Sequence, residues 1–331
     1  VAACAVAAHQ RHLQQNSAKC DAALAVPPSG VEKKIDTISY SQNEPRNNIT
    51  LNRLRSKKAR SLHEKYDIAW NVVLGHGSYG AVYPCRLCMN GERAALKVIN
   101  KKYTDQSSFH RETDALLRIY DNGGHRNISG LRDVYEDSSC YYLVLDMISG
   151  GEIFDHLVEG GAFCEADASR LMREAASALM FLHENGIVHS DLKPENLMLT
   201  SKRREHGTLK IIDFGSAIIT HDIDEEVPEQ SDCKSCDVST GTIAYWPPER
   251  FANGGCCKPT TAMDMWSTGV ILYIMLTGIH PFDPEGHASD KEIELRIKDN
   301  PTTPIYAPHV SHLSASAIDL IKKLLEPDPM K

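Results

Sequence analysis

The sequence lacks several features that would place it in other classes of protein. No apolar run approaches the roughly 18 residues that a membrane-spanning helix requires. No repeat with a period of about 20–50 residues is visible, so a solenoid or propeller is not expected. The chain begins at Val1 rather than at Met and is interpreted as a fragment, so targeting signals are not readable from it. Because no membrane-spanning run is present, we expect a soluble protein. Its expected location is the cytoplasm, with the nucleus as the alternative.

Charge is distributed unevenly along the 331 residues, whose formal net charge is −8. Residues 1–60 hold ten Lys/Arg and four Asp/Glu, whereas the remainder holds 26 and 40. Residues 1–61 mix polar, proline and charged residues without a sustained period, which is typical of segments that do not offset their ordering entropy. They are predicted to form a basic, disordered tail. Its basic end, 53–60, is interpreted as a solvated charge run, with contact to anionic surfaces or phosphoproteins as the alternative, and no nucleic-acid partner is expected.

Ten cysteines in a chain of this length favour a reducing compartment over a disulfide scaffold. Two CxxC pairs, Cys85/Cys88 and Cys233/Cys236, together with Cys256–Cys257, raise the alternative of a zinc site. That alternative is disfavoured because Cys85 and Cys88 are predicted on a strand, where residues three apart face opposite ways. A redox switch at Cys233/Cys236 remains a separate hypothesis.

The pattern of apolar residues changes twice along the chain. From Tyr66 onward it consists of short β-like runs broken by glycine, with one helical stretch; the predicted strands are 68–74, 81–87, 93–99 and 141–147, and the helix is 107–120. After Glu152 apolar residues recur every three to four positions in 166–183, 264–276 and 315–325, which predicts helices. The sequence thus predicts an α+β fold with a small, mostly antiparallel sheet followed by a larger helical lobe.

A glycine-rich segment, 74–82, lies between the first two predicted strands. Its GxGxxGxV pattern begins at Gly75, and glycine lets backbone N–H groups approach phosphate oxygens without an intervening Cβ. A dinucleotide-binding loop has a similar pattern but runs from a strand directly into a helix. A strand follows here, so the dinucleotide alternative is disfavoured.

Lys97 lies within an apolar strand, 17 residues after Gly80, where an ammonium requires an anionic partner. The phosphates of ATP are one such partner. Glu112, in the following helix, is the natural counter-ion that would hold Lys97 in place. The alternative is that Glu112 is a surface residue pairing locally with Arg111 or Arg118.

The segment 187–196, Ile-Val-His-Ser-Asp-Leu-Lys-Pro-Glu-Asn, is followed by Asp213-Phe214-Gly215. Phosphoryl transfer requires a carboxylate at the nucleophile and oxygen ligands for Mg²⁺. Asp191 would orient the substrate hydroxyl and accept its proton, and Lys193 would stabilise the transferring phosphoryl group. Asn196 and Asp213 would hold the metal ions.

With these motifs the sequence resembles the protein kinase family, from about Tyr66 to the last residue. Further matches are Gly241-Thr242, Pro247-Pro248-Glu249 in place of the usual Ala-Pro-Glu, and the segment 264–269. Lys193 together with Thr242 resembles the Ser/Thr branch. The resemblance implies a kinase domain over 66–331 that uses ATP with Mg²⁺, or Mn²⁺ as an alternative, to phosphorylate protein hydroxyls. It also implies a bilobal fold with an N-lobe at about 66–145, a hinge at 146–151 and a C-lobe at 152–331 that is truncated at its end.

The resemblance further implies which residues contact ATP. Leu145 takes the place of the gatekeeper, the backbone of Asp146–Ile148 binds adenine, and Val82, Ala95 and Met198 enclose the base. The complete implied set is Leu74, Gly75, Gly77, Gly80, Val82, Ala95, Lys97, Glu112, Leu145, Asp146, Met147, Ile148, Glu152 and Met198. Core packing alone is an alternative explanation for the apolar members. The family's regulatory spine falls on Leu116, Leu131, His189 and Phe214.

Within the family, the segments 142–154, 165–169 and 275–283 resemble the calcium/calmodulin-dependent kinase group. In that group the acid matching Glu152 faces an Arg three residues before the phosphoacceptor, which implies a preference for R-x-x-S/T substrates. The alternative role for Glu152 is contact with the ribose hydroxyls. A calcium/calmodulin-type regulator would act through segments outside this chain, since no EF-hand loop occurs within it.

The sequence departs from the family pattern at Ser190, which replaces the Arg that usually binds a phosphate on the activation loop. Ile218 and Ser108 likewise occupy positions where relatives often place basic groups. We therefore expect activity that does not depend on phosphorylation of the acidic activation loop. Relatives also pair the acid matching Glu249 with an Arg that would lie beyond Lys331. The alternative to an active enzyme is a pseudokinase scaffold, which is disfavoured because the catalytic set is complete.

Overall fold

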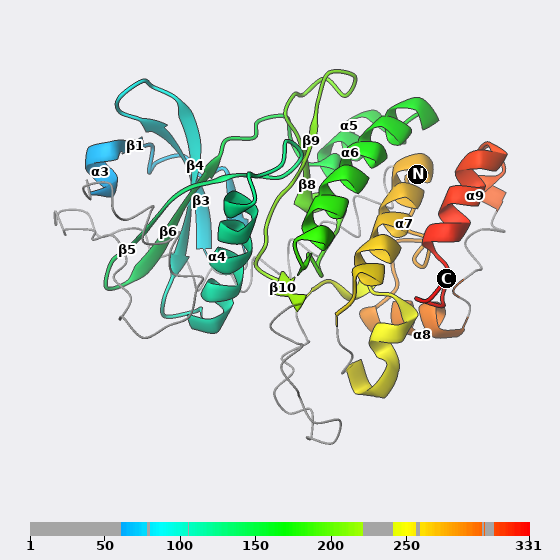
Figure 1. The fold of residues 1–331 in the computed structure, drawn as a ribbon. Coiled ribbons are helices and arrows are strands. Elements are labelled where there is room, and N and C mark those ends of the chain that lie inside the picture. Colours follow the sequence, from blue (N-terminus) through cyan, green and yellow to red (C-terminus); the bar gives the residue numbers. More distant parts are fainter. Residues whose placement is uncertain are drawn as a thin grey trace. The chain divides into compact units, whose positions relative to one another are not determined.

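The computed structural model describes residues 61–77, 80–104, 106–220, 241–255, 259–299, 301 and 308–331 (Figure 1). These residues divide into two compact units. The N-terminal unit comprises 61–125 and 129–148, and the C-terminal unit comprises 126–128 and 149–331. The chain passes from one unit to the other between Ile148 and Ser149, inside the predicted hinge. Apart from Ser61, the predicted tail lies outside the described residues.

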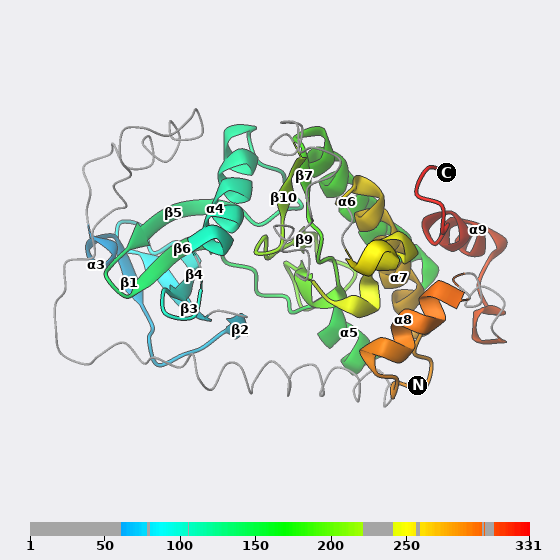
Figure 2. The same cartoon turned by 90° about the horizontal axis from the view of Figure 1, so that it is seen from below.

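The N-terminal unit is built on an antiparallel sheet. Its strands are β1 (Tyr66–Ile68), β2 (Gly75–Gly77), β3 (Gly80–Leu87), β4 (Arg93–Asn100), β5 (Leu131–Glu136) and β6 (Cys140–Asp146). They follow the order β1-β3-β4-β6-β5, with β2 paired to β3 at the side of this path. Helix α3 (Leu62–Lys65) precedes β1, and α4 (Gln106–Asp121) follows β4 (Figure 2). Ser61 caps α3, because its side chain accepts a hydrogen bond from Glu64 N.

Alternation of side chains fixes which face of this sheet is buried. Along β3, buried and partly exposed residues alternate, as expected for a strand with one face on a core. Helix α4 packs against the sheet through Phe109, whose ring stacks on that of Tyr141 with centroids 3.7 Å apart and an interplanar angle of 4°. Phe109 is 1% exposed. This contact positions α4, and with it Glu112, relative to the strands.

The C-terminal unit is mainly helical. Its α-helices are α5 (Ile153–Gly160), α6 (Glu165–Glu184), α7 (Thr261–Thr277), α8 (Asp290–Asp299) and α9 (Ala315–Leu324). Two short antiparallel pairs join β7 (Ile187–Val188) to β10 (Ile218–Ile219), and β8 (Leu197–Leu199) to β9 (Leu209–Ile211). Short 3-10 turns complete it: η1 (Pro194–Asn196), η3 (Ile243–Tyr245), η4 (Pro248–Gly255) and η6 (Pro308–Val310).

Helix α7 is the centre of the C-terminal unit. It is apolar around most of its circumference and buried from Met263 to Thr277 except at Met265, as expected of a helix surrounded by other elements. It packs against α6 and α9 (Figures 1 and 2). Consequently, the side chains at the start of α7 are held in place by the packing of this helix against its neighbours.

The β-rich unit followed by a helical unit confirms the predicted α+β class. The predicted strands 81–87, 93–99 and 141–147, the helix 107–120 and the three later helices are confirmed to within a few residues. The predicted strand 68–74 is wrong beyond Ile68, because Ala69–Val72 form a turn and Val72 and Val73 are each 43% exposed. Their apolar composition resembles that of a strand, but no neighbouring strand pairs with them. Strands β2 and β5, the short pairs β7–β10 and β8–β9, and helices α3, α5 and α8 were missed.

No helix within the described ranges has the length and apolar character needed to span a bilayer.

Candidate active site

Lys97 and Glu112 form an ion pair inside the N-terminal unit. The Lys97 Nζ lies 2.6 Å from Glu112 Oε1, and the two side chains are only 12% and 6% exposed. Lys97 comes from β4 and Glu112 from α4, so the pair joins the sheet to the helix. The predicted partnership is therefore present, rather than the local alternative in which Glu112 serves only Arg111 or Arg118.

The predicted ATP contacts of the N-terminal unit share one face of the sheet. In the strand register Val82 is opposite Lys97, which is opposite Leu143, and Ala95 is opposite Leu145. Residues two apart on a strand and residues directly opposite across strands point to the same face. Val82, Ala95, Lys97 and Leu145 therefore project to one side.

The glycines of the predicted phosphate loop have different surroundings. Gly75 and Gly77 lie in β2, and Gly80 begins β3. A Cβ at Gly80 would collide with the carbonyl oxygen of Val98 on β4, whereas a Cβ at Gly75 would meet nothing within 4 Å. Gly80 is thus required by strand packing, while Gly75 leaves open space beside the backbone. Ser78 and Tyr79 lie outside the described residues.

The end of β6 carries the predicted hinge. The Asp146 carboxylate accepts hydrogen bonds from Arg132 Nε at 3.0 Å and from Gly130 N at 3.1 Å. These contacts hold the strand end that leads into Met147 and Ile148. Leu74 precedes β2, and it is 46% exposed.

Glu152 and Met198 belong to the C-terminal unit. They form an isolated antiparallel bridge, so the segment before α5 lies beside β8. The backbone N–H of Glu152 donates to Asp155 Oδ2 at 3.1 Å, which caps the start of α5. The backbone at Glu152 is thereby fixed in place.

A single buried carboxylate, Asp264 of α7, holds the segment before Asp191. Asp264 is 1% exposed. Its Oδ2 accepts hydrogen bonds from His189 N at 2.9 Å and lies 2.8 Å from His183 Nε2, while its Oδ1 accepts from Ser190 N at 2.9 Å. The central helix of the unit therefore anchors the catalytic segment directly.

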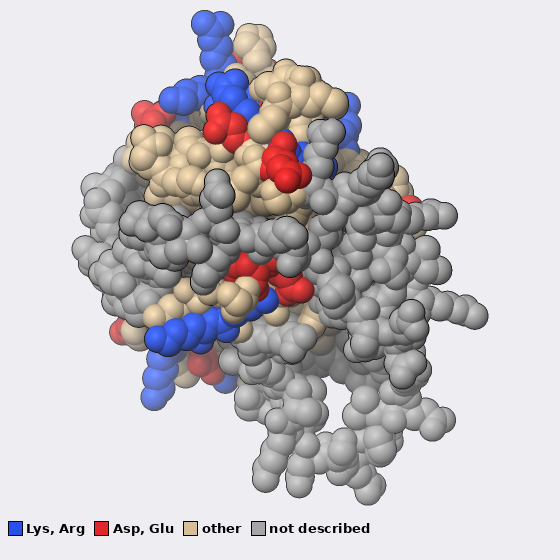
Figure 3. Space-filling view, turned by 90° about the vertical axis from the view of Figure 1, so that its left-hand side faces the viewer, with Lys and Arg blue, Asp and Glu red and all other residues tan. Residues whose placement is uncertain are grey.

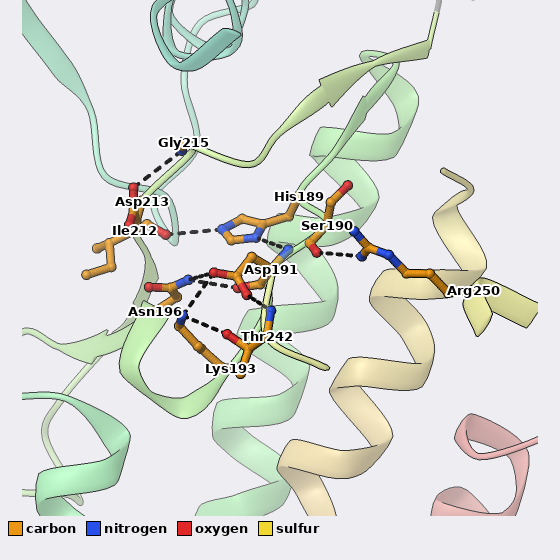
Figure 4. Close-up of polar contacts among 10 residues, drawn as sticks. All are labelled: His189, Ser190, Asp191, Lys193, Asn196, Ile212, Asp213, Gly215, Thr242 and Arg250. Atoms are coloured by element: carbon orange, nitrogen blue, oxygen red, sulfur yellow. Dashed lines mark hydrogen bonds and ion pairs between the residues drawn. The ribbon is translucent and has the colours of Figure 1, made fainter. Parts of the chain in front are cut away.

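Each oxygen of the Asp191 carboxylate has its own partner (Figure 4). Oδ1 accepts the backbone N–H of Thr242 at 2.8 Å, and Oδ2 lies 3.0 Å from Lys193 Nζ. Lys193 Nζ also donates to Thr242 Oγ1 at 3.0 Å. The backbone oxygen of Asp191 accepts from Asn196 Nδ2 at 2.7 Å. A carboxylate, an ammonium and a hydroxyl from segments about 50 residues apart in sequence are thus brought together.

Lys193 is a charged donor in this arrangement. Burial opposes its charged form, but the carboxylates of Asp191 and Glu195 outweigh that effect and raise the pKa of Lys193. At neutral pH the ammonium therefore persists beside Asp191.

Asn196 and Asp213 flank the β8–β9 pair. Leu197 is opposite Ile211 in the register, and the Asn196 backbone oxygen accepts Ile212 N at 2.9 Å. Asp213 adopts a left-handed backbone conformation with φ 58°, and its Oδ1 accepts Gly215 N at 3.3 Å. An amide oxygen and a carboxylate at neighbouring strand ends suit a hard cation such as Mg²⁺. Within the described residues no group of three or more His, Cys, Asp or Glu is arranged to hold a metal, so a cation here would take other ligands from phosphates and water.

His189 links the catalytic segment to the segment around Asp213. Its Nε2 donates to the Ile212 carbonyl at 3.1 Å, and its ring lies 5.2 Å from that of Phe214. The two predicted spine residues of the C-terminal unit are therefore in contact. Leu116 and Leu131, the other two, are buried in the N-terminal unit.

A second layer of residues holds η3, the turn that begins after Thr242, and none of them had been assigned a role from sequence. His280 Nε2 donates to the Ala244 carbonyl at 3.1 Å, and His280 Nδ1 accepts from Phe282 N at 3.2 Å. This pair of bonds requires a neutral imidazole, and burial lowers the pKa of His280 to about 4. Ser267 Oγ donates to the Tyr245 carbonyl at 2.9 Å. Burial raises the pKa of Tyr245, and the negative charges of Glu195 and Asp191 add to this effect.

The departures from the family pattern have a structural counterpart. Ser190 has φ 66°, and its buried Oγ makes no hydrogen bond. Its carbonyl accepts a hydrogen bond from Arg250 Nη1 at 3.1 Å (Figure 4). Arg250 was not identified from sequence, because its contact with Ser190 spans 60 residues of chain.

Two further sequence hypotheses concern cysteine and surface charge. Cys85 is buried and Cys88 exposed, and both are free thiols; the other CxxC pair and Cys256–Cys257 lie outside the described residues. On the face shown in Figure 3, the described Lys and Arg side chains occur in separate groups with Asp and Glu among them. The absence of a nucleic-acid partner stays a prediction.

Comparison with known proteins gives consistent matches. Residues 69–331 match the family model described as "Protein kinase domain". "Serine/threonine-protein kinase PKZ1" of Phytophthora infestans is 38% identical over 277 residues, which cover 77% of this chain and 65% of that protein. "Calcium-dependent protein kinase 4" of Plasmodium berghei is 38% identical over 257 residues, covering 76% of this chain and 44% of the relative. "Calcium/calmodulin-dependent protein kinase type I" of Schizosaccharomyces pombe is 38% identical over 260 residues, covering 78% and 72%. The chain spans less than two thirds of the length of the first two relatives.

Proposed function

Because the chain belongs to the protein kinase family, we propose that it transfers the γ-phosphoryl group of ATP to Ser and Thr hydroxyls of proteins. The observation that carries the proposal is the arrangement of Asp191, Lys193 and Thr242, in which a carboxylate and an ammonium lie 3.0 Å apart and are braced by the same threonine. Phosphoryl transfer depends on such positioned charges more than on covalent chemistry.

In the proposed reaction the substrate hydroxyl oxygen forms a bond to the γ-phosphorus, and the bond from that phosphorus to the β,γ-bridging oxygen breaks to release ADP. Asp191 Oδ2 orients the hydroxyl and takes up its proton. Lys193 donates to the phosphoryl oxygens during transfer, and Lys97, held by Glu112, binds the α- and β-phosphates. Mg²⁺ bound through Asn196 and Asp213 would neutralise phosphate charge, and Mn²⁺ has the same preference for oxygen ligands.

Substrate selection is part of the proposal. We infer that Glu152 favours an Arg three residues before the acceptor, because its backbone is fixed by the α5 cap and a carboxylate is a suitable partner for a guanidinium. The names of relatives include calcium and calmodulin dependence. A regulator of that type would act on this protein through segments outside the chain. Location in the cytoplasm or nucleus likewise stays a prediction.

The test is γ-phosphate transfer from ATP, with Mg²⁺ or Mn²⁺, to two Ser peptides that differ only in Arg or Ala three residues before the acceptor. Wild type is compared with Asp191→Ala, and with Glu205→Ala as a control that removes an exposed acid. Transfer that is lost only in Asp191→Ala supports the kinase. A drop in the Arg preference of Glu152→Gln supports the specificity assignment, and an unchanged preference removes it.

The second candidate is a pseudokinase scaffold, which shares the fold. The complete set of Lys97, Glu112, Asp191, Asn196 and Asp213 argues against it. A folded protein that binds ATP but transfers no phosphate in this assay would make the scaffold the better description.

A further inference from the structure

Arg250 is a buried cation next to the catalytic segment. It lies in η4 and is 2% exposed. Its guanidinium carbon is 4.0 Å from the ring centroid of Trp246, and its Nη1 donates to the Ser190 carbonyl at 3.1 Å. A buried charge is costly unless it is satisfied by specific contacts, so these contacts fix where the guanidinium lies. Figure 4 shows the Arg250 side chain extending toward Ser190.

The oxygen that Arg250 binds belongs to the peptide group that joins Ser190 to Asp191. Ser190 is in the left-handed region with φ 66°, which is unfavourable for a residue with a side chain. Its N–H is held by Asp264 Oδ1 at 2.9 Å and its carbonyl by Arg250. Both ends of the strained residue are therefore fixed, and with them the direction in which the chain enters Asp191.

A second segment packs against the two groups that Arg250 contacts. A Cβ at Gly241 would lie 3.0 Å from the Ser190 oxygen and 3.1 Å from Trp246 Nε1. Gly241 therefore packs against both the carbonyl that Arg250 binds and the ring on which Arg250 stacks. The next residue, Thr242, donates its N–H to Asp191 Oδ1 at 2.8 Å. Arg250 thus binds the carbonyl of the residue before Asp191 and stacks on the ring beside Gly241, the neighbour of the Thr242 amide that holds the Asp191 carboxylate.

We propose that Arg250 is a positioning residue for Asp191: from inside the fold, its guanidinium holds the peptide group that joins Ser190 to Asp191. This inference rests on the proposed kinase function. Since a guanidinium stays protonated in proteins and Arg250 is buried in the folded unit, the contact does not depend on phosphorylation. The alignment of Asp191 is then a permanent property of the folded C-terminal unit.

The test compares steady-state kinetics of wild type, Arg250→Met and Arg250→Lys. Arg203→Met, which removes an exposed arginine of the same unit, is the control. Because misplacement of a catalytic group costs up to about 100-fold in rate, we expect Arg250→Met to lower kcat by about 10- to 100-fold. KM for ATP and for peptide should stay within about twofold. Arg250→Lys should recover part of kcat, because its ammonium can still donate to the Ser190 carbonyl.

Hydrogen exchange provides a second measurement, which does not need activity. In Arg250→Met the amide of Thr242 should exchange faster, while that of Leu272 in the middle of α7 should exchange as in wild type. If both amides accelerate together, Arg250 only stabilises the fold, and the positioning role is wrong. It is equally wrong if kcat and the Thr242 amide are both unchanged. Absence of transfer by wild type itself would instead refute the proposed function, and the exchange result would then stand alone.

Discussion

Lys97 of β4 and Glu112 of α4 lie with Nζ and Oε1 2.6 Å apart, and both side chains are largely buried. The contact depends on how α4 docks, which the stack of Phe109 on Tyr141 determines. Removing one partner of a buried ion pair is strongly destabilising, because the other partner is left as an unpaired charge that is shielded from water.

Replacing Lys97 with Met should destabilise the N-terminal unit. The carboxylate of Glu112 stays buried while its ammonium partner is removed, so the free energy of unfolding should fall by roughly 3–5 kcal/mol. Urea denaturation measures this change. The double variant Lys97→Met, Glu112→Leu should regain much of the loss, since no buried acid remains. Additive losses in the double variant would show that the two side chains are not coupled.

Substitution of two neighbouring glycines should have opposite outcomes. Gly80→Ala places a Cβ against the Val98 carbonyl and should force β3 and β4 apart, whereas Gly75→Ala adds a methyl group in open space. We expect a clear drop in melting temperature for Gly80→Ala and a change within about 0.5 kcal/mol for Gly75→Ala. Equal effects of the two changes would contradict the packing reason given for Gly80.

Removing the hydroxyl of Thr242 should weaken catalysis without unfolding the protein. Thr242→Val retains the backbone N–H that donates to Asp191 but not the Oγ1 that accepts from Lys193. Hydrogen bonds to charged groups are worth about 1.5–3 kcal/mol, so kcat should fall by about 10- to 100-fold. Thr242→Ser keeps the hydroxyl and serves as the control. Loss of activity in both variants would indicate that the hydroxyl is not the group that matters.

Acid should destabilise the C-terminal unit through His280. Its pKa is lowered to about 4 in the folded state from the ordinary value of 6.5, so between these values the unfolded chain binds more protons. The contribution of the neutral imidazole is therefore fully present above pH 6.5 and is lost as pH falls toward 4, at up to about 1.4 kcal/mol per pH unit.

Melting curves between pH 4 and pH 8 check this expectation. His280→Gln should show a shallower loss of stability on acidification than wild type. His206→Gln, which changes an exposed imidazole, should follow the wild-type curve. Parallel curves for wild type and His280→Gln would exclude His280 as the group responsible.

Phosphorylation of the activation loop should not be required for activity. The candidate acceptors Ser231, Ser235, Ser239 and Thr240 lie outside the described residues, and Ser190 offers no cationic side chain to receive a phosphate. A variant with all four changed to Ala should keep kcat within about threefold of wild type. A loss of more than tenfold, reproduced by phosphatase treatment of wild type, would show that a loop phosphate is needed.

The sequence was sufficient where the chemistry is encoded locally. Lys97, Asp191, Lys193 and Asp213 stand in short motifs with fixed spacing, so each was assigned without knowing its neighbours. The partner of Glu112 was left open, because local arginines satisfied the same requirement and only the docking of α4 decides between them.

Other parts could not be predicted because they depend on tertiary contacts. Val72 and Val73 have strand-like side chains, yet they follow a turn and lie on the surface. Arg250 follows the Pro-Pro-Glu motif, and arginine is a residue type usually found on the protein surface. Its burial follows from a stack on Trp246 and a bond to a carbonyl 60 residues away, and neither has a sequence signal.

The three donors gathered on Asp264 link the catalytic segment to the most tightly packed helix of the unit. The amides of His189 and Ser190 can exchange with solvent only when the start of α7 separates from them. They should therefore rank among the slowest exchanging amides of the C-terminal unit. On heating, catalytic activity should be lost in the same cooperative transition in which this unit unfolds. We expect no temperature range in which the helical core is intact and the catalytic segment is detached.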